Sequence, residues 1–213
     1  MKKIIALSLA LAAGTYSSSA MAEAFSGPYV GAEIGREGYE VKAKNMAIGS
    51  LTVSADGISG NGVVGGIFAG YDFALSKSIF AGVEATVNLS SAKISASATD
   101  GVSTISAAVK ARESFGGSAR LGAMLNDSTG IYARLGWIRT KFEVEAMGTV
   151  LGHNHREAFQ YGGGLETRVT NHATLRVEYT RLSYGSAGLN ALTGLNGIHV
   201  DNDQFRLGAS YRF

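Results

Sequence analysis

Four glutamates and four arginines stand at positions where they could form one layer of ion pairs. Each lies in a segment that alternates apolar and polar residues, three to seven residues from the end that carries a short turn. The eight residues are Glu33, Glu84, Arg120, Arg134, Glu166, Arg176, Glu178 and Arg206. Because a guanidinium is a planar fork of donors, one arginine can bridge several carboxylates. The pairs expected between neighbouring segments are Glu84 with Arg120, Arg134 with Glu166, Glu178 with Arg206, and Arg206 with Glu33.

This charged layer has two interpretations. In the first, ion pairs and hydrogen bonds plug the interior of a closed barrel. In the second, the same side chains line a narrow charged conduit. The interior of an eight-stranded barrel is just wide enough for side chains, and glycines on the same face, such as Gly31, Gly82 and Gly208, make room for long ones. We therefore favour the plug, and the conduit remains the alternative.

Other chemistry has weaker candidates. His153 and His155 lie in a charged segment expected to be a loop, and two histidines without a further ligand do not define a metal site. His199, Asp201 and Asp203 are expected at the rim of the last strand, but no motif joins them to a nucleophile. Phosphate loops, cysteine metal motifs and nucleotide fingerprints do not occur. We predict no catalytic residue, metal or cofactor, with a rim-site enzyme as the remaining alternative.

Eight alternating segments would hold these residues as antiparallel strands. They cover about 29–41, 62–73, 79–89, 109–125, 131–137, 159–169, 174–180 and 204–213. Their connections alternate between long (42–61, 90–108, 143–156, 184–200) and short (74–78, 126–130, 170–172). All the short turns therefore fall on one side, as the periplasmic turns of transmembrane β-barrels do. The Ser- and Thr-rich long segments predict flexible surface loops, or strands that extend beyond the membrane.

The types of residue on each face separate a membrane barrel from a soluble one. A soluble barrel buries its apolar residues and exposes its charges. Here the polar face consists of glycine and of charges placed mid-strand, where water would not reach them if that face met lipid. We assign the Ile, Leu, Val and Ala residues outward to lipid and the Gly, Glu and Arg residues inward.

Aromatic residues support this assignment. Tyr71 and Phe73 lie at the turn ends of their strand, whereas Trp137 and Tyr179 lie further along theirs. With a rise of ~3.4 Å per residue and ~40° of tilt, the two groups are roughly 15–25 Å apart. That spacing fits two aromatic girdles around an apolar band of ~25 Å.

The last segment is amphipathic and ends on an aromatic residue. Its apolar face comprises Phe205, Leu207, Ala209, Tyr211 and Phe213. A strand of this kind resembles the final strand of bacterial outer-membrane barrels, which the barrel assembly machinery reads. The soluble alternative is an ordinary half-buried edge strand.

The N-terminus has the composition of a secretory signal peptide. Lys2 and Lys3 precede an apolar run over 4–13 and an Ala20-Met21-Ala22 cleavage site. We predict a signal peptide over 1–22 and a barrel domain over 23–213. Without Lys2 and Lys3 the chain has 17 basic and 17 acidic residues, so its charge gives no reason to expect nucleic-acid binding. Cysteine is absent, proline occurs once and glycine 29 times, which favours an all-β chain without disulfides.

Several short motifs together resemble a known family. They are Gly27-Pro28-Tyr29-Val30-Gly31, Gly70-Tyr71, Gly82-Val83-Glu84, Arg120-Leu121-Gly122, Glu178-Tyr179 and Tyr211-Arg212-Phe213. The chain is similar, over essentially all of its mature length, to the small outer-membrane β-barrels of proteobacteria, related to the OmpA/OmpX-type and opacity-type barrels and often labelled porin-like. The resemblance implies an eight-stranded antiparallel up-and-down barrel in the outer membrane.

The family resemblance also implies partners. Outer-membrane lipid and lipopolysaccharide would surround the barrel, and a host or matrix ligand could bind the long loops. Members of the family include envelope proteins, adhesins and surface antigens. We therefore expect a non-enzymatic surface protein with a structural or interaction role, and a narrow channel for small solutes or ions as the alternative.

Overall fold

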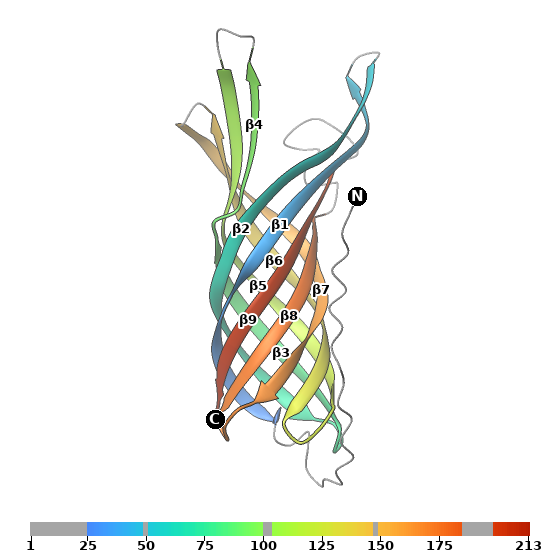
Figure 1. Ribbon diagram of the computed structural model, residues 1–213, viewed down its shortest axis with the longest axis vertical. Helices are drawn as coiled ribbons and strands as arrows, with labels where there is room; N and C mark the ends of the chain where they lie inside the picture. Colours follow the sequence, from blue (N-terminus) through green and yellow to red (C-terminus); the bar gives the residue numbers. More distant parts are fainter. Residues whose placement is uncertain (1–24, 49–50, 100–103, 147–148, 185–197) are drawn as a thin grey trace.

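The computed structural model describes residues 25–48, 51–99, 104–146, 149–184 and 198–213, which form a closed antiparallel barrel (Figure 1). The strands are β1 (Gly27–Ile48), β2 (Leu51–Ala74), β3 (Ile79–Ser90), β4 (Lys93–Thr99), β5 (Thr104–Met124), β6 (Thr129–Ala146), β7 (Thr149–Arg168), β8 (Ala173–Tyr184) and β9 (Ile198–Arg212). In the part of the chain so described, no helix is long and apolar enough to cross a membrane.

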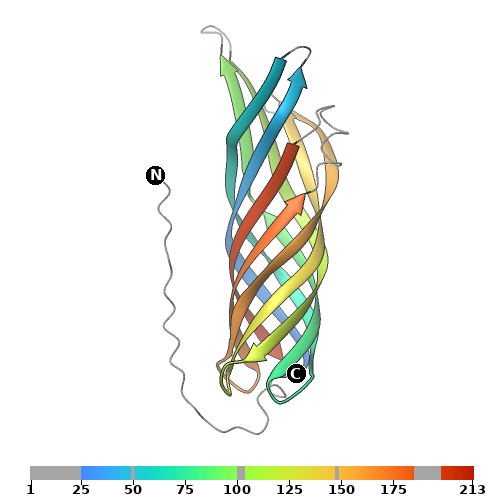
Figure 2. The ribbon, with the colours of Figure 1, turned by 90° about the vertical axis from the view of Figure 1, so that its right-hand side faces the viewer.

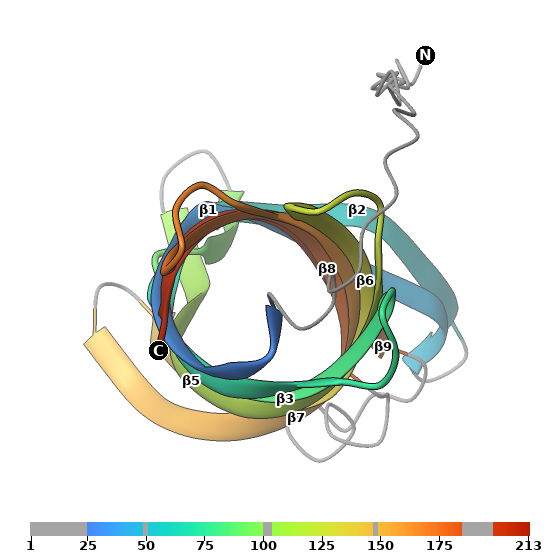
Figure 3. The same ribbon diagram turned by 90° about the horizontal axis from the view of Figure 1, so that it is seen from below.

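The nine strands occupy eight positions around the barrel. β3 and β4 follow one another in the same position, and both pair with β5. The barrel closes where β1 pairs with β9, from Tyr29 opposite Arg212 to Ala43 opposite Ile198. Seen from below, the strands complete a ring (Figure 3). The predicted eight-stranded antiparallel barrel is confirmed.

The three short turns share one design. In each, the residue after the strand donates its backbone N–H to the first residue of the next strand, as Leu75 does to Ile79 at 2.9 Å. A side-chain oxygen inside the turn accepts a second backbone N–H. The oxygen of Asn126 accepts from Thr129 at 2.8 Å, and that of Thr170 accepts from Ala173 at 2.9 Å. Short polar side chains of this kind favour turns by bonding to nearby backbone groups.

Three of the four predicted long loops are mostly strand instead. The pairing of β1 with β2 continues to Ile48 opposite Leu51, and that of β6 with β7 continues to Ala146 opposite Thr149. The hairpins of β1–β2 and β4–β5 rise well beyond the upper ends of β8 and β9 (Figure 2). Short runs in them do alternate, as Leu51-Thr52-Val53-Ser54 does, and the alternative of strands that extend beyond the membrane is the one observed. Most of the fourth predicted loop, 184–200, lies outside the described residues, as do the predicted signal peptide and the predicted chain start at Glu23.

Alternation sorts the side chains between the lumen and the outer wall. On β3, Phe80, Glu84 and Asn88 are buried in the lumen, while Val83 and Val87 point outward and are exposed. The outer wall is thus an apolar surface over the lower barrel, and the molecule has its core in the lumen.

The predicted girdle and terminal residues all lie on this outer wall. Tyr71, Phe73, Trp137 and Tyr179 are each 42–51% exposed. The alternate residues of β9 and its end, Phe205, Leu207, Ala209, Tyr211 and Phe213, are also exposed outward. Their roles as membrane girdles and as an assembly signal remain predictions.

Candidate functional site in the barrel lumen

All eight charged residues predicted for the interior are buried in the lumen. They are Glu33, Glu84, Arg120, Arg134, Glu166, Arg176, Glu178 and Arg206, and each is at most 6% exposed. Since side chains on a strand alternate between its two faces, one parity on every strand brings them to the same interior. Together with two further residues, they form two closed rings of ion pairs.

The lower ring, nearer the short turns, consists of Asp72, Arg120, Glu166 and Arg212. Arg120 donates to both oxygens of Asp72, with Nε 2.8 Å from Oδ1, and its Nη1 lies 2.7 Å from Glu166 Oε2. Arg212 Nη2 lies 2.9 Å from Asp72 Oδ2 and 3.2 Å from Glu166 Oε1. Each arginine thus contacts both acids, and the ring is electrically neutral.

The upper ring has three acids and three arginines. Around it, Glu33 contacts Arg176 (2.6 Å), Arg176 contacts Glu84 (2.6 Å), Glu84 contacts Arg134, Arg134 contacts Glu178 (2.8 Å), Glu178 contacts Arg206 (2.8 Å) and Arg206 contacts Glu33 (2.6 Å). Every acid again has two arginines and every arginine two acids. Charge-assisted bonds of this type are the stronger hydrogen bonds in proteins.

Two of the four predicted pairs are wrong. Glu84 does not pair with Arg120, and Arg134 does not pair with Glu166. The reason is register: Arg120 lies directly opposite Arg134 on adjacent strands, so the like charges turn toward different rings. Their long side chains instead reach across the lumen to strands that are not neighbours. The predicted pairs Glu178–Arg206 and Arg206–Glu33 are present, at 2.8 Å and 2.6 Å.

Asp72 and Arg212 were missed by the sequence analysis, as were two tyrosines that complete the network. The hydroxyl of Tyr29 donates to Glu84 Oε2 at 3.0 Å, and that of Tyr132 donates to Glu178 Oε2 at 2.8 Å. Strand parity marks all four as inward. They lie at the turn ends of their strands, closer to the short turns than the eight charged residues that were predicted to form one layer.

Aromatic rings and a glycine fit around the guanidinium groups. The Arg120 guanidinium carbon lies 4.8 Å from the centre of the Tyr29 ring, and that of Arg176 lies 3.5 Å from the Phe68 ring centre. A Cβ added at Gly208 would come within 3.0 Å of the Arg176 side chain. The lumen therefore has little free space beside the rings.

Apolar clusters lie at both ends of the charged layers. At the turn end, Phe25 stacks on Phe80 with ring centres 5.8 Å apart, beside Met124 and Tyr132. At the opposite end a cluster fills the lumen: Tyr39, Ala92, Ala111, Ile138, Ala158, Leu182 and Tyr184, with Phe142 and Val200 packed against it. The ionic rings are thus enclosed by packed side chains above and below.

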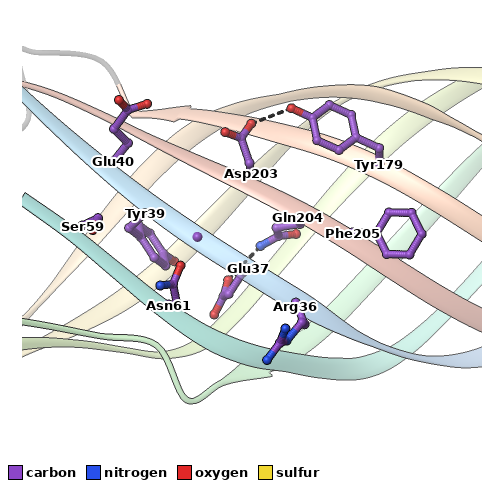
Figure 4. Close-up of a pocket in the computed structure, with 11 residues that line it drawn as sticks. Arg36, Glu37, Tyr39, Glu40, Ser59, Asn61, Tyr179, Asp203, Gln204 and Phe205 are labelled. Atoms are coloured by element: carbon purple, nitrogen blue, oxygen red, sulfur yellow. Dashed lines mark hydrogen bonds between the residues drawn. The ribbon is translucent and has the colours of Figure 1, made fainter. Parts of the chain in front are cut away.

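A hollow of about 570 Å³ lies beside β1, β2, β8 and β9, next to Tyr179 (Figure 4). The residues around it carry both signs of charge, including Arg36, Glu40 and Asp203. The Tyr179 hydroxyl donates to Asp203 Oδ1 at 2.7 Å. Nearby, Arg181 Nη2 lies 2.7 Å from Asp201 Oδ2.

The other candidate residues do not form a site. His153 and His155 lie on β7 and not in a loop, and both are exposed, with ring centres 6.3 Å apart. The rim acids Asp201 and Asp203 contact Arg181, while the side chain of His199 lies outside those described. Among the residues whose placement is described, no group of three or more His, Cys, Asp or Glu is arranged to hold a metal.

Ion pairs also occur at the upper ends of β5 and β6, beyond Phe115 and Trp137 and away from the short turn that joins these strands. Lys141 Nζ lies 2.9 Å from Glu113 Oε1, and Arg112 Nε lies 2.7 Å from Glu143 Oε2. The hydrogen bond from Lys141, with a backbone hydrogen bond, lowers the pKa of Glu113 below its ordinary value of 4.5. These pairs are in contact with solvent, unlike those of the rings.

Comparison with known proteins agrees with this architecture. The family model described as "Outer membrane protein beta-barrel domain" matches residues 6–213. Neisserial surface protein A is 18% identical, with 88% of this chain and 98% of that one covered and a TM-score of 0.51. Ail, the attachment invasion locus protein of Yersinia pestis, solved with the heparin analogue sucrose octasulfate, is also 18% identical, with 88% and 99% covered and a TM-score of 0.44. OprG of Pseudomonas aeruginosa is 13% identical, with 88% and 97% covered and a TM-score of 0.43. No curated protein sequence matches the chain.

Proposed function

Because the chain belongs to the outer membrane protein β-barrel family, we propose that it is a non-enzymatic surface protein whose plugged barrel anchors its long hairpins. The family places it in the bacterial outer membrane, in contact with outer-membrane lipid. The finer role, as a structural or adhesion-like protein, is the proposal.

The observation that carries the proposal is the closed lumen. Five buried arginines are each shared between two acids, and packed apolar clusters lie above and below them. Breaking a buried pair costs several kcal/mol, so the rings resist the rearrangement that a water-filled path would need. A rigid barrel with exposed hairpins is the arrangement in which binding residues are commonly presented on surface segments.

Recording in a planar bilayer tests the plug. Purified protein inserted into the bilayer should show no steady conductance, because ion pairs and packed apolar clusters occupy the lumen. A stable, reproducible conductance would instead support the narrow channel for small solutes or ions. The variant Arg134→Ala, which removes the long side chain from the upper ring, serves as the positive comparison and should increase leakage.

Deletion of the hairpin ends tests the interaction role. The hairpins of β1–β2, β4–β5 and β6–β7 are the candidate sites for a host or matrix ligand. Replacing all three tips and residues 185–197 by short turns should abolish binding to host cells or matrix while the barrel still folds. If binding survives all four replacements, the hairpins are not the ligand site.

The C-terminal strand is the proposed contact for the barrel assembly machinery. Phe213 ends the outward apolar row of β9 and is 70% exposed. Phe213→Ser should lower the amount of folded barrel in the outer membrane without changing the stability of protein refolded in detergent. Equal membrane levels would contradict this assignment.

A further inference from the structure

Glu37 differs from every other buried acid in the lumen. Among the side chains described, the buried acids are Glu33, Glu37, Asp72, Glu84, Glu166 and Glu178, and the buried bases are Arg120, Arg134, Arg176, Arg206 and Arg212. Five acids and five arginines make up the two neutral rings. Glu37 lies one layer above the upper ring and contacts no arginine, so the buried layers carry one negative charge in excess.

The contacts of Glu37 are all with neutral groups. Asn202 Nδ2 and Gln204 Nε2 donate to its Oε2 at 2.9 Å and 3.0 Å, and Ser90 Oγ donates to its Oε1. Figure 4 shows Gln204 reaching Glu37 between β1 and β9. These dipoles solvate the carboxylate but do not neutralise it, and an uncompensated buried charge is costly.

The same two amides have oxygens without partners. Asn202 Oδ1 and Gln204 Oε1 are buried and accept no hydrogen bond, in side chains that are 0% and 4% exposed. Each oxygen shares a carbon with a nitrogen that donates to Glu37, so a half-turn of the amide exchanges the positions of the two atoms. Asn88 Oδ1, on β3 two residues before Ser90, is likewise buried and without a donor. Buried acceptors of this kind normally have a partner.

We propose that Glu37, Asn202 and Gln204 bind one monovalent metal cation, Na⁺ or K⁺, in the lumen above the ionic rings. Its ligands would be a carboxylate oxygen of Glu37 and the amide oxygens of Asn202 and Gln204, and hard cations prefer oxygen. One carboxylate balances one positive charge, whereas Ca²⁺ sites usually draw on several carboxylates. A half-turn of either amide would bring its oxygen toward the cation without moving the backbone.

The site lies between the upper ring and the upper apolar cluster. The upper ring closes it from below, and the apolar cluster that contains Tyr39 and Tyr184 lies on the other side. Glu37 and Gln204 also line the hollow beside β1, β2, β8 and β9, and a cation would reach the site from that side. It neutralises the lumen, and it does not mark a conduction path.

The test is refolding in detergent with NaCl, KCl or choline chloride at equal ionic strength, followed by urea unfolding. The midpoint of the natural sequence should be higher in NaCl or KCl than in choline chloride and should rise with the logarithm of the cation concentration, as for any ligand of the folded state. Glu37→Gln should remove this dependence. Equal midpoints in the three salts, or a dependence that persists in Glu37→Gln, would overturn the proposal.

Two further variants separate the site from general salt effects. Gln204→Lys places an ammonium where the amide now donates to Glu37, so it should be stable in choline chloride and insensitive to the choice of salt. Glu113→Gln removes an exposed carboxylate and should keep the full dependence. The infrared band of a protonated carboxyl group, present at neutral pH and absent in Glu37→Gln, would show that a proton takes the place of the metal and would refute the site.

Discussion

The lumen and the upper ends of β5 and β6 both contain pairs of acidic and basic residues, but in opposite surroundings. Arg134 and Glu178 are wholly buried at 2.8 Å, whereas Lys141 and Glu113 are 24% and 51% exposed at 2.9 Å. The distances are nearly equal. Distance alone therefore does not separate the two regions, and their energetic difference must come from solvent and from how many partners each charge has.

Removal of one partner has opposite consequences in the two places. An exposed charge that loses its partner is solvated by water, so little free energy is lost. A charge in a ring has no water to replace its partner, and the remaining members of the ring cannot rearrange within the packed lumen. The rings thus hold the strands in one register more through the cost of breaking them than through the gain of forming them.

The largest expected effect comes from opening the upper ring. Glu84→Ala would leave Arg134 and Arg176 each with a single acid, and should lower the free energy of unfolding by ~3–5 kcal/mol. Urea titration of protein refolded in detergent measures this. The matched change at the upper end of β5, Glu113→Ala, should leave the urea midpoint almost unchanged. If the two variants unfold at the same urea concentration, the ring is not a buried network.

A smaller effect is expected from a change of shape at constant charge. Arg212→Lys keeps the positive charge in the lower ring, but a single ammonium cannot reproduce a fork whose Nη2 contacts Asp72 and Glu166 while its Nη1 donates to the Phe25 carbonyl. Loss of one charge-assisted hydrogen bond should cost about 1.5–3 kcal/mol in the same titration. A lysine variant as stable as the natural protein would show that charge alone, and not the fork, maintains this ring.

The sequence predicted which side chains enter the lumen but not which of them meet. Alternation along β3 is enough to turn Glu84 inward, because the period of a strand is fixed. Its partners, Arg134 and Arg176, are on strands that do not adjoin β3, and their approach depends on the stagger of the closed barrel. Asp72 was overlooked because it lies at the turn end of β2, closer to the short turn than the eight residues that were predicted to form one layer.

The hairpins were harder to predict for a related reason. A strand signal in sequence is mostly the alternation imposed by a core on one side. Residues 42–61 and 90–108 alternate only in short runs of small residues, such as Ile94-Ser95-Ala96-Ser97, which were equally consistent with loops. Glu37 shares the parity of Glu33, yet nothing in the sequence shows that the five arginines are already fully used by other acids.

The smallest expected effect is that of the exposed pair. A double-mutant cycle of Lys141→Met and Glu113→Gln should give a coupling free energy below about 1 kcal/mol, decreasing with added salt. Because the folded-state pKa of Glu113 is lowered from 4.5, its contribution is present above that pH and is lost as the pH falls through the lowered value. The same cycle on Arg134 and Glu178 should give a much larger, salt-insensitive coupling. Equal coupling free energies would mean that solvent reaches the lumen as freely as it reaches the upper ends of β5 and β6. The barrel would then be open and not plugged.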